Sequence, residues 1–311
     1  MKQSCVVVAA RGNQLSQAFA SALGADFIEA CVSRFPDGEL HVQVPNIQHA
    51  SVCVWQSLAA PVNDQLVQLL LLLNALRRSK SCRVLAIVPY FGYARQQSTP
   101  CYSELQLFSR LLCTAGAAHI VSLDIHGMRG QSETVLPQLQ QVQALPLFIN
   151  DMRQQLDAQR IDRSAVVVVS PDAGGAHVAA ACAQKLGVGV AIVDKKRLTA
   201  AAVRCSLKQG DLTNCRVAIV IDDLIDSGQT LIQTAHLLRQ HNVSAVWAYA
   251  THALLTQPQP FFKQCHLLDS LVVTDTVVPS PQLLQCRCAR VLSCVPLLAQ
   301  AAGCWFGRPM V

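Results

Sequence analysis

Unbroken runs of aliphatic residues recur along this chain, and segments of helical periodicity separate them. The runs are rich in valine and isoleucine and do not alternate with polar residues, which is typical of strands buried on both faces of a parallel sheet. They fall at residues 4–10, 51–55, 83–90, 119–126, 165–169, 189–193, 216–223, 244–252 and 270–276.

The segments between these runs favour helices, because their apolar residues recur every three or four positions. The clearest examples are residues 13–24, 62–79, 103–116 and 174–187. Strands that alternate with helices are typical of βαβ units and a parallel sheet. The pattern restarts near residue 147, so we expect two α/β domains, residues 1–146 and 147–311.

The composition limits the classes of partner. Hydrophobic residues make up 51% of the 311 residues and charged residues only 14%, against about 25% charged in average proteins. Either much of the chain is buried, or other subunits cover part of its surface, and the second explanation favours an oligomer. The net charge is +6, but the basic residues are scattered, so we expect no nucleic-acid partner. A substrate that carries several phosphate groups is also compatible with this net positive charge.

No segment predicts a membrane span or an export signal. The most apolar run, residues 66–76, is far shorter than the roughly 20 residues that a span requires. The first residues lack the apolar core of a signal peptide. We therefore expect no membrane partner and a cytoplasmic location.

The 14 cysteines are many for such a chain, but no C-x-x-C pair occurs. The densest group is Cys286, Cys288 and Cys294. Two interpretations stay open for it: a zinc site, or cysteines that fill small apolar positions of the core, as free cysteines often do.

Polar residues gather where several predicted strands end, which is where open α/β sheets bind their ligands. The run before Asp222 and Asp223 is followed by Asp226, Ser227, Gly228 and Thr230. Small residues before a helix can hold a phosphate against backbone N–H groups, and the carboxylates can accept hydrogen bonds from sugar hydroxyls. A pentose 5-phosphate fits both features. A capped turn with solvent-exposed acids is the alternative.

Residues 222–230, DDLIDSGQT, resemble the phosphoribosyl-binding loop of type I phosphoribosyltransferase folds. Further stretches resemble the ribose-phosphate pyrophosphokinase family, in its order and spacing: RFPDGE, PYFGYARQ, SPDAGG, DKKR, ATH, LVVTDTVVP and VLSCVPLLAQA. The resemblance implies two type I phosphoribosyltransferase-like domains, each a mainly parallel sheet flanked by helices.

The resemblance also implies an activity. The family transfers the diphosphoryl group of ATP to the 1-hydroxyl of ribose 5-phosphate and releases phosphoribosyl diphosphate (PRPP) and AMP. By this resemblance, ribose 5-phosphate binds at Asp222, Asp223, Asp226, Ser227, Gly228 and Thr230. Members of the family are usually homo-oligomers built from dimers, often hexamers.

Roles in ATP binding and catalysis follow from the same resemblance. It assigns adenine binding to Phe35, Asp37 and Glu39, and contact with ATP to Arg95 and Gln96. It associates His126 and Asp172 with Mg²⁺ and assigns catalysis to Lys195 and Arg197. Without the resemblance, each of these assignments has a plainer alternative. The adenine segment fits a solvated turn, the basic residues fit surface charges, and His126 fits a structural histidine.

The sequence departs from the family at Gln229, where the synthetases usually have glycine, at Gln97, and in the segments after His126 and Arg197. Two other functions therefore stay open. One is a phosphoribosyltransferase that consumes PRPP, and the other is a catalytically weak regulatory subunit.

Overall fold

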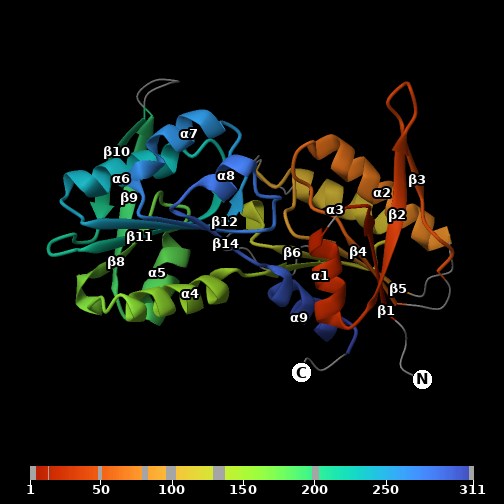
Figure 1. Cartoon of the computed structure of the whole chain (residues 1–311), viewed down its shortest axis with the longest axis horizontal. Coiled ribbons are helices and arrows are strands. Elements are labelled where there is room, and N and C mark those ends of the chain that lie inside the picture. The colour runs from red at the N-terminus through yellow and green to blue at the C-terminus, as the bar shows by residue number, and fades with distance from the viewer. Residues whose placement is uncertain are drawn as a thin grey trace. The chain divides into compact units, whose positions relative to one another are not determined.

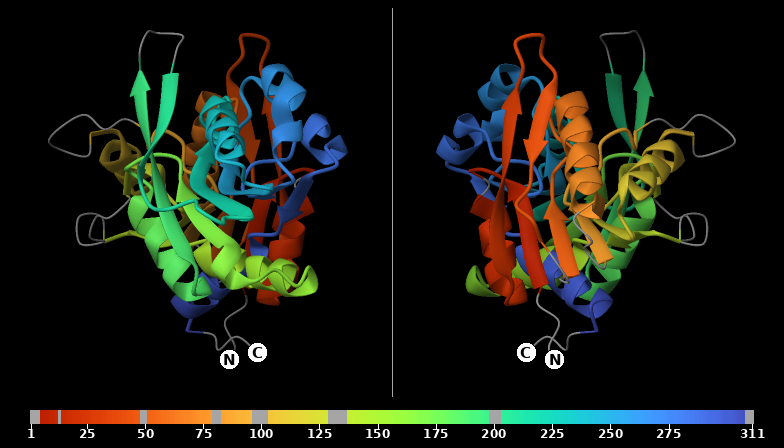
Figure 2. Two further views of the ribbon diagram at one scale, coloured as in Figure 1. Left: turned by 90° about the vertical axis from the view of Figure 1, so that its left-hand side faces the viewer. Right: turned by 90° about the vertical axis from the view of Figure 1, so that its right-hand side faces the viewer.

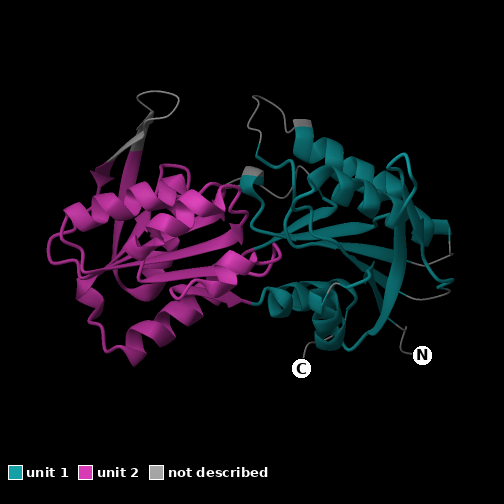
Figure 3. Cartoon of the chain, turned by 45° about the horizontal axis from the view of Figure 1, so that its top comes forward, with its two compact units in different colours: residues 1–142, 293–311 teal, residues 143–292 magenta. Residues whose placement is uncertain are grey.

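The computed structural model describes residues 5–12, 14–47, 51–78, 83–95, 103–128, 137–197 and 203–307. It has two compact units (Figure 3), Met1–Val142 with Ser293–Val311, and Gln143–Leu292. This division differs from the expected one, because the chain returns to the first unit after residue 292. Helix α9, Val295–Trp305, packs against α1, Gln14–Leu23, and against β6, His119–Leu123.

The first unit is built on a seven-stranded sheet in the order β3-β2-β1-β4-β5-β6-β7. Only β3 runs antiparallel to its neighbour. The other strands are β1 Cys5–Ala10, β2 Asp26–Arg34, β3 Leu40–Gln43, β4 Ser51–Trp55, β5 Arg83–Val88 and β7 Leu139–Val142. The remaining helices are α2 Val62–Arg78 and α3 Ser103–Ala115.

Helices cover both faces of this sheet, with α2 and α3 on one side and α1 and α9 on the other (Figure 1). Leucines of α2 at three- and four-residue spacing line the core with alternate residues of the central strands. On the opposite face the ring of Phe19 in α1 lies 5.0 Å from that of Trp55. Burial on both faces explains why β4 and β5 read as continuous apolar runs.

The second unit has a seven-stranded sheet in the order β10-β9-β8-β11-β12-β13-β14, with only β10 antiparallel to its neighbour. Helices α4 and α5 lie on one face, and α6, α7 and α8 on the other (Figure 1). The strands are β8 Val166–Ser170, β9 Gly189–Arg197, β10 Val203–Gln209, β11 Val217–Ile225, β12 Ala245–Ala253, β13 Ser270–Thr274 and β14 Ala289–Leu292. The helices are α4 Leu145–Ala158, α5 Ala176–Leu186, α6 Gln229–Gln240, α7 Pro258–Gln264 and α8 Pro281–Gln285.

Each sheet ends at one edge in an antiparallel hairpin, β2–β3 in the first unit and β9–β10 in the second. Figure 2 shows each hairpin extending beyond the rest of its own sheet. The prediction of two mainly parallel sheets flanked by helices is confirmed. Among the described residues, no helix combines the length and the apolar character that crossing a membrane would require.

Candidate functional site

The centre of the second sheet places two acidic segments side by side. After β8 the chain turns to β9 on one side, and after β11 it turns to β12 on the other. Such a reversal of direction is where open α/β sheets bind ligands. The register pairs Val220 of β11 with Val169 of β8. Asp222 and Asp172 follow these paired residues closely, so both lie at the carboxyl edge of this sheet.

Asp222 and Asp223 lie within β11, because the strand continues to Ile225 through its pairing with Ala253 of β12. The strand therefore extends two residues beyond the run 216–223 that the sequence indicated. Asp222 is half-buried and Asp223 is 9% exposed. The backbone N–H of Asp223 donates to Oδ1 of Asp222 at 2.9 Å, which orients the Asp222 carboxylate.

Gly228 makes the tight turn between β11 and α6. Its φ of 78° lies in the left-handed region, which side chains with a Cβ disfavour. A Cβ at this position would also lie 2.2 Å from Cδ2 of Phe261 in α7. Both the backbone conformation and the packing therefore require glycine at this position. Gln229, by contrast, is the first residue of α6 and needs no special backbone conformation.

The amino end of α6 has the properties of an anion site. The N-cap residue Gly228 has no side chain that could cap this end, and no acid lies in the first turn of the helix. Backbone N–H groups there carry partial positive charge and favour a phosphate. Ser227 precedes Gly228, and its Oγ lies 3.4 Å from the N–H of Gln229. Ser227 and Thr230 are half-buried, so their hydroxyls border the same end of the helix.

Asp226 is held by a residue that the sequence did not single out. The Oγ1–H of Thr256 donates to Oδ1 of Asp226 at 2.7 Å, and the N–H of Thr256 donates to the Asp226 carbonyl at 2.9 Å. No sequence motif marked Thr256, which is 30 residues distant along the chain.

Asp172 closes the loop between β8 and α5. Its Oδ1 accepts a hydrogen bond from the N–H of Gly175, the N-cap of α5, at 3.0 Å. The Ser170 hydroxyl donates to the Asp172 carbonyl at 2.7 Å. These two bonds fix a half-buried carboxylate at the same edge as Asp222.

A buried polar network lies at the carboxyl ends of β12 and β13. Nδ1 of His252 lies 2.8 Å from the hydroxyl of Thr276, and Thr274 Oγ1–H donates to the Thr251 carbonyl at 2.6 Å. His252 is paired in register with Leu224 of β11, so the network supports the acidic strand end. These residues belong to the motifs ATH and TDT, for which no role was predicted.

Lys195 and Arg197 lie two positions apart near the end of β9, paired in register with Cys205 and Val203 of β10. For these two residues the structure describes the backbone alone. The predicted pair is therefore part of the β9–β10 hairpin at one edge of the sheet.

The predicted adenine segment forms the tight turn of the β2–β3 hairpin. The N–H of Phe35 donates to the Glu39 carbonyl at 2.9 Å, and Asp37 Oδ1 accepts from the N–H of Glu39 at 3.1 Å. Phe35 is 51% exposed, with its ring 5.4 Å from that of His41. Arg34 braces the turn through bonds to the Gly38 carbonyl and to Asp64, at 2.7 and 2.8 Å. An exposed aromatic ring beside carboxylates suits the recognition of a planar base.

The other first-unit candidates follow neighbouring strands. Arg95 lies exposed beyond β5, whereas Gln96 falls outside the described residues. His126 is half-buried and begins a short 3₁₀ helix, His126–Met128, beyond β6. Since β5 and β6 are parallel neighbours, Arg95 and His126 lie at the same edge of that sheet.

Comparisons with known proteins identify the family. Residues 5–116 match the N-terminal domain of ribose phosphate pyrophosphokinase, and residues 205–306 match the phosphoribosyl synthetase-associated domain. A ribose-phosphate pyrophosphokinase of Burkholderia pseudomallei is 34% identical, over 92% of this chain and 89% of the relative. The chain belongs to the ribose-phosphate pyrophosphokinase family.

Two further relatives agree with this assignment. The ribose-phosphate pyrophosphokinase of Hyphomonas neptunium is 36% identical, over 92% of this chain and 91% of its own. The crystal structure of phosphoribosylpyrophosphate synthetase from Mycobacterium smegmatis superimposes with a TM-score of 0.81 at 28% identity, covering 98% of this chain and 99% of its own.

These matches confirm the predicted family and enzyme class. The protein is a transferase of the kinase type that makes PRPP, with ATP and ribose 5-phosphate as its substrates. They support PRPP synthesis over the two alternatives, a transferase that consumes PRPP and a weak regulatory subunit.

Proposed function

We propose that the end of β11 and the turn into α6 bind ribose 5-phosphate. The amino end of α6, with Ser227, Gly228 and Thr230, holds the 5-phosphate, and Asp222, Asp223 and Asp226 accept hydrogen bonds from the sugar hydroxyls. The observation that carries this assignment is the left-handed Gly228, which is the N-cap of α6 and follows directly after three carboxylates.

ATP is assigned to the first unit. Phe35 stacks on the adenine, while Asp37 and Glu39 accept hydrogen bonds from its amino group. Arg95 and Gln96 contact the phosphates, where a guanidinium can donate two hydrogen bonds at once. The exposed ring of Phe35 and the braced turn that carries it support this assignment.

Lys195 and Arg197 are the proposed catalytic cations. The 1-hydroxyl oxygen of ribose 5-phosphate forms a bond to the β-phosphorus of ATP, and the bond from that phosphorus to the α–β bridging oxygen breaks, so that AMP leaves. The hydroxyl proton passes to solvent. Negative charge spreads over the transferring group, and two nearby cations stabilise it.

Magnesium is the proposed metal, with Asp172 and His126 as the associated residues. The donor chemistry fits better at Asp172, because Mg²⁺ prefers oxygen ligands and Asp172 offers a half-buried carboxylate that is fixed by its loop. Bound to the phosphates of ATP, the ion would neutralise charge in the reacting group.

The test of these site assignments combines turnover with binding. Purified protein is mixed with ATP, Mg²⁺ and ribose 5-phosphate, and AMP and PRPP are measured together. We expect equal amounts of both, and neither without the sugar. Asp223→Asn should weaken the binding of ribose 5-phosphate, whereas Phe35→Ala should raise the KM for ATP alone. Unchanged constants in both variants would refute the site assignments.

We also propose a cytoplasmic homo-oligomer built from dimers. The eleven cysteines whose side chains the structure describes form no disulfides, which suits a reducing compartment. The low charged fraction of 14% suits a surface partly covered by other copies. Light scattering coupled to gel filtration measures the number of copies, and a strictly monomeric active enzyme would contradict the assembly.

A further inference from the structure

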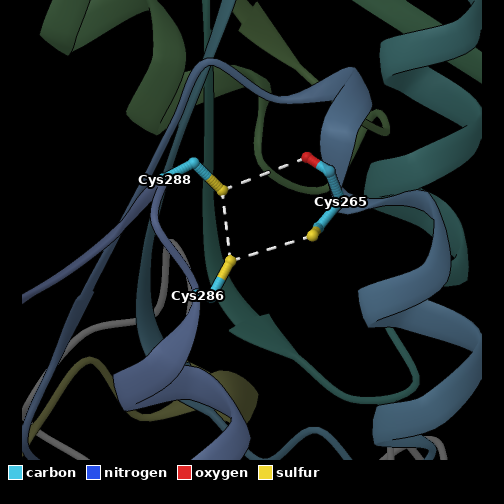
Figure 4. A group of neighbouring side chains, drawn as sticks. All are labelled: Cys265, Cys286 and Cys288. Atoms are coloured by element: carbon cyan, nitrogen blue, oxygen red, sulfur yellow. Dashed lines mark hydrogen bonds between the residues drawn. The ribbon is translucent and has the colours of Figure 1, made fainter.

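Three thiols converge in the second unit (Figure 4). Cys286 and Cys288 belong to the turn between α8 and β14, and Cys265 begins the short 3₁₀ helix Cys265–Leu267 after α7. The Sγ atoms of Cys286 and Cys288 are 3.3 Å apart, and those of Cys286 and Cys265 are 3.7 Å apart. All three sulfurs lie within 4.8 Å of one another.

This cluster differs from the group that the sequence suggested. Cys294 belongs to the first unit, where it is fully buried at the start of α9. Cys265, which lies 21 residues before Cys286, takes its place. Only folding brings Cys265 to the C-x-C pair, so no spacing rule marked it.

Backbone hydrogen bonds hold the positions of the three cysteines. The N–H of Ala289 donates to the Cys286 carbonyl at 3.0 Å and closes the turn that carries the C-x-C pair. The N–H of Leu271 donates to the Cys288 carbonyl at 2.8 Å, and that of Leu268 to the Cys265 carbonyl at 2.9 Å. The sulfurs are therefore presented by backbone that is already ordered, which lowers the cost of binding a ligand.

The cluster is separate from the candidate active site. Cys265 and Cys288 come shortly before β13 and β14, whereas Asp172 and Asp222 lie where β8 and β11 end. Because these strands are parallel, the two sites lie at opposite edges of the same sheet.

The distances between the sulfurs fit a bound ion better than a disulfide. A zinc–sulfur bond is about 2.3 Å, so two thiolates on a tetrahedral zinc ion lie about 3.8 Å apart. The observed 3.7 Å agrees with that value, and the 3.3 Å pair needs only a small adjustment. A disulfide needs about 2.05 Å.

We propose that Cys265, Cys286 and Cys288 bind a zinc ion, with the fourth coordination position taken by water. Three S–H bonds break as three sulfur–zinc bonds form, and three protons pass to solvent. The half-buried setting of all three cysteines leaves room for the water ligand. The bound ion ties the end of α7 to the turn before β14.

The test uses the full chain reduced with a phosphine, so that no added thiol competes for metal. Zn²⁺ is added, excess ion is removed by gel filtration, and the retained metal is measured. We expect one equivalent per chain. Cys286→Ser and Cys288→Ser should each lower the affinity at least about 100-fold, since even residues behind the ligands can change affinity by 10–100-fold. The matched control is Cys304→Ser, an exposed cysteine of the first unit, which should retain the ion.

Two further measurements keep the outcome clear. Co²⁺ should give a thiolate charge-transfer band in the wild type and not in the cluster variants, which excludes binding at carboxylates. Zn²⁺ should raise the thermal midpoint of the wild type by several degrees and leave that of the variants unchanged. AMP formation should persist in all of them.

Three results would overturn the zinc site. The first is a wild type that retains no zinc, and the second is equal retention in the cluster variants. The third is a disulfide among these cysteines, found by mass spectrometry of the unreduced protein. None of the three bears on the ribose 5-phosphate site, whose own test is turnover.

Discussion

At the scale of single residues, the structure places different constraints on two neighbours, Gly228 and Gln229. Gly228 needs its left-handed backbone and the space beside Phe261, while Gln229 only begins a helix. The departure from the family at Gln229 therefore leaves the shape of the turn intact.

We predict that Gly228→Ala removes most activity and that Gln229→Gly does not. The added Cβ meets Phe261 and a disfavoured φ, at a cost of about 2–4 kcal/mol in unfolding free energy. The kcat/KM for ribose 5-phosphate should fall about 100-fold or more, whereas Gln229→Gly should change it less than about threefold. Steady-state kinetics and urea unfolding measure both effects. Wild-type kinetics in Gly228→Ala would contradict the proposed site.

Asp151 of α4 is buried and joins the half-buried Arg290 to the buried Tyr249 in the second unit. It accepts two hydrogen bonds from Arg290 of β14, at 2.8 and 2.7 Å, and one from Tyr249 of β12 at 2.7 Å. Burial acts to raise the pKa of Asp151, but the hydrogen bonds from Arg290 and Tyr249 and the positive charge of Arg290 outweigh it and lower the pKa.

We predict that Asp151 makes the stability depend on pH in the acidic range. Its folded pKa lies below the unfolded value of about 3.9, so its contribution is full at neutral pH and is lost as pH falls below about 4. Asp151→Asn should cost about 2 kcal/mol near pH 7 and flatten the acidic slope. Urea unfolding at several pH values tests this, and an identical slope in wild type and variant would contradict it.

At the scale of elements, the hairpin β9–β10 carries the proposed catalytic cations, with Lys196 between them. Lys196 has the same charge and lies in the same strand, so it provides a matched control for the proposed roles of Lys195 and Arg197.

We predict that Lys195→Ala and Arg197→Ala each lower kcat about 10³-fold, by analogy with other cations that stabilise phosphoryl transfer. Lys196→Ala should stay within about tenfold of the wild type. Single-turnover measurement of AMP separates chemistry from substrate binding. If all three variants lose activity equally, the general charge of the hairpin matters and the assignment of two catalytic residues fails.

At the scale of the whole molecule, helix α9 completes the first unit, although the whole second unit precedes it in the sequence. The guanidinium carbon of Arg83 lies 4.1 Å from the ring centre of Trp305, and the ring of His119 lies 6.1 Å from that ring. These contacts join α9 to the starts of β5 and β6.

We predict that Trp305→Ala destabilises the first unit by about 2 kcal/mol, through lost apolar burial and the lost cation–π contact. Limited proteolysis should then cut the first unit sooner and leave fragments of residues 143–292. Cys304→Ser, one position earlier and exposed, should resemble the wild type. Equal protease resistance in both variants would contradict the role of α9.

The sequence by itself determined the sheets, the acidic strand ends and the family, because these features depend on residues close together in the chain. Continuous valine runs indicate buried parallel strands, and short motifs keep their order. The tertiary structure alone decided four other features. They are the contact of Thr256 with Asp226, the packing of Phe261 over Gly228, the return of α9 to the first unit, and the meeting of Cys265 with Cys286 and Cys288. Each of these depends on packing between distant segments, which no local pattern of residues specifies.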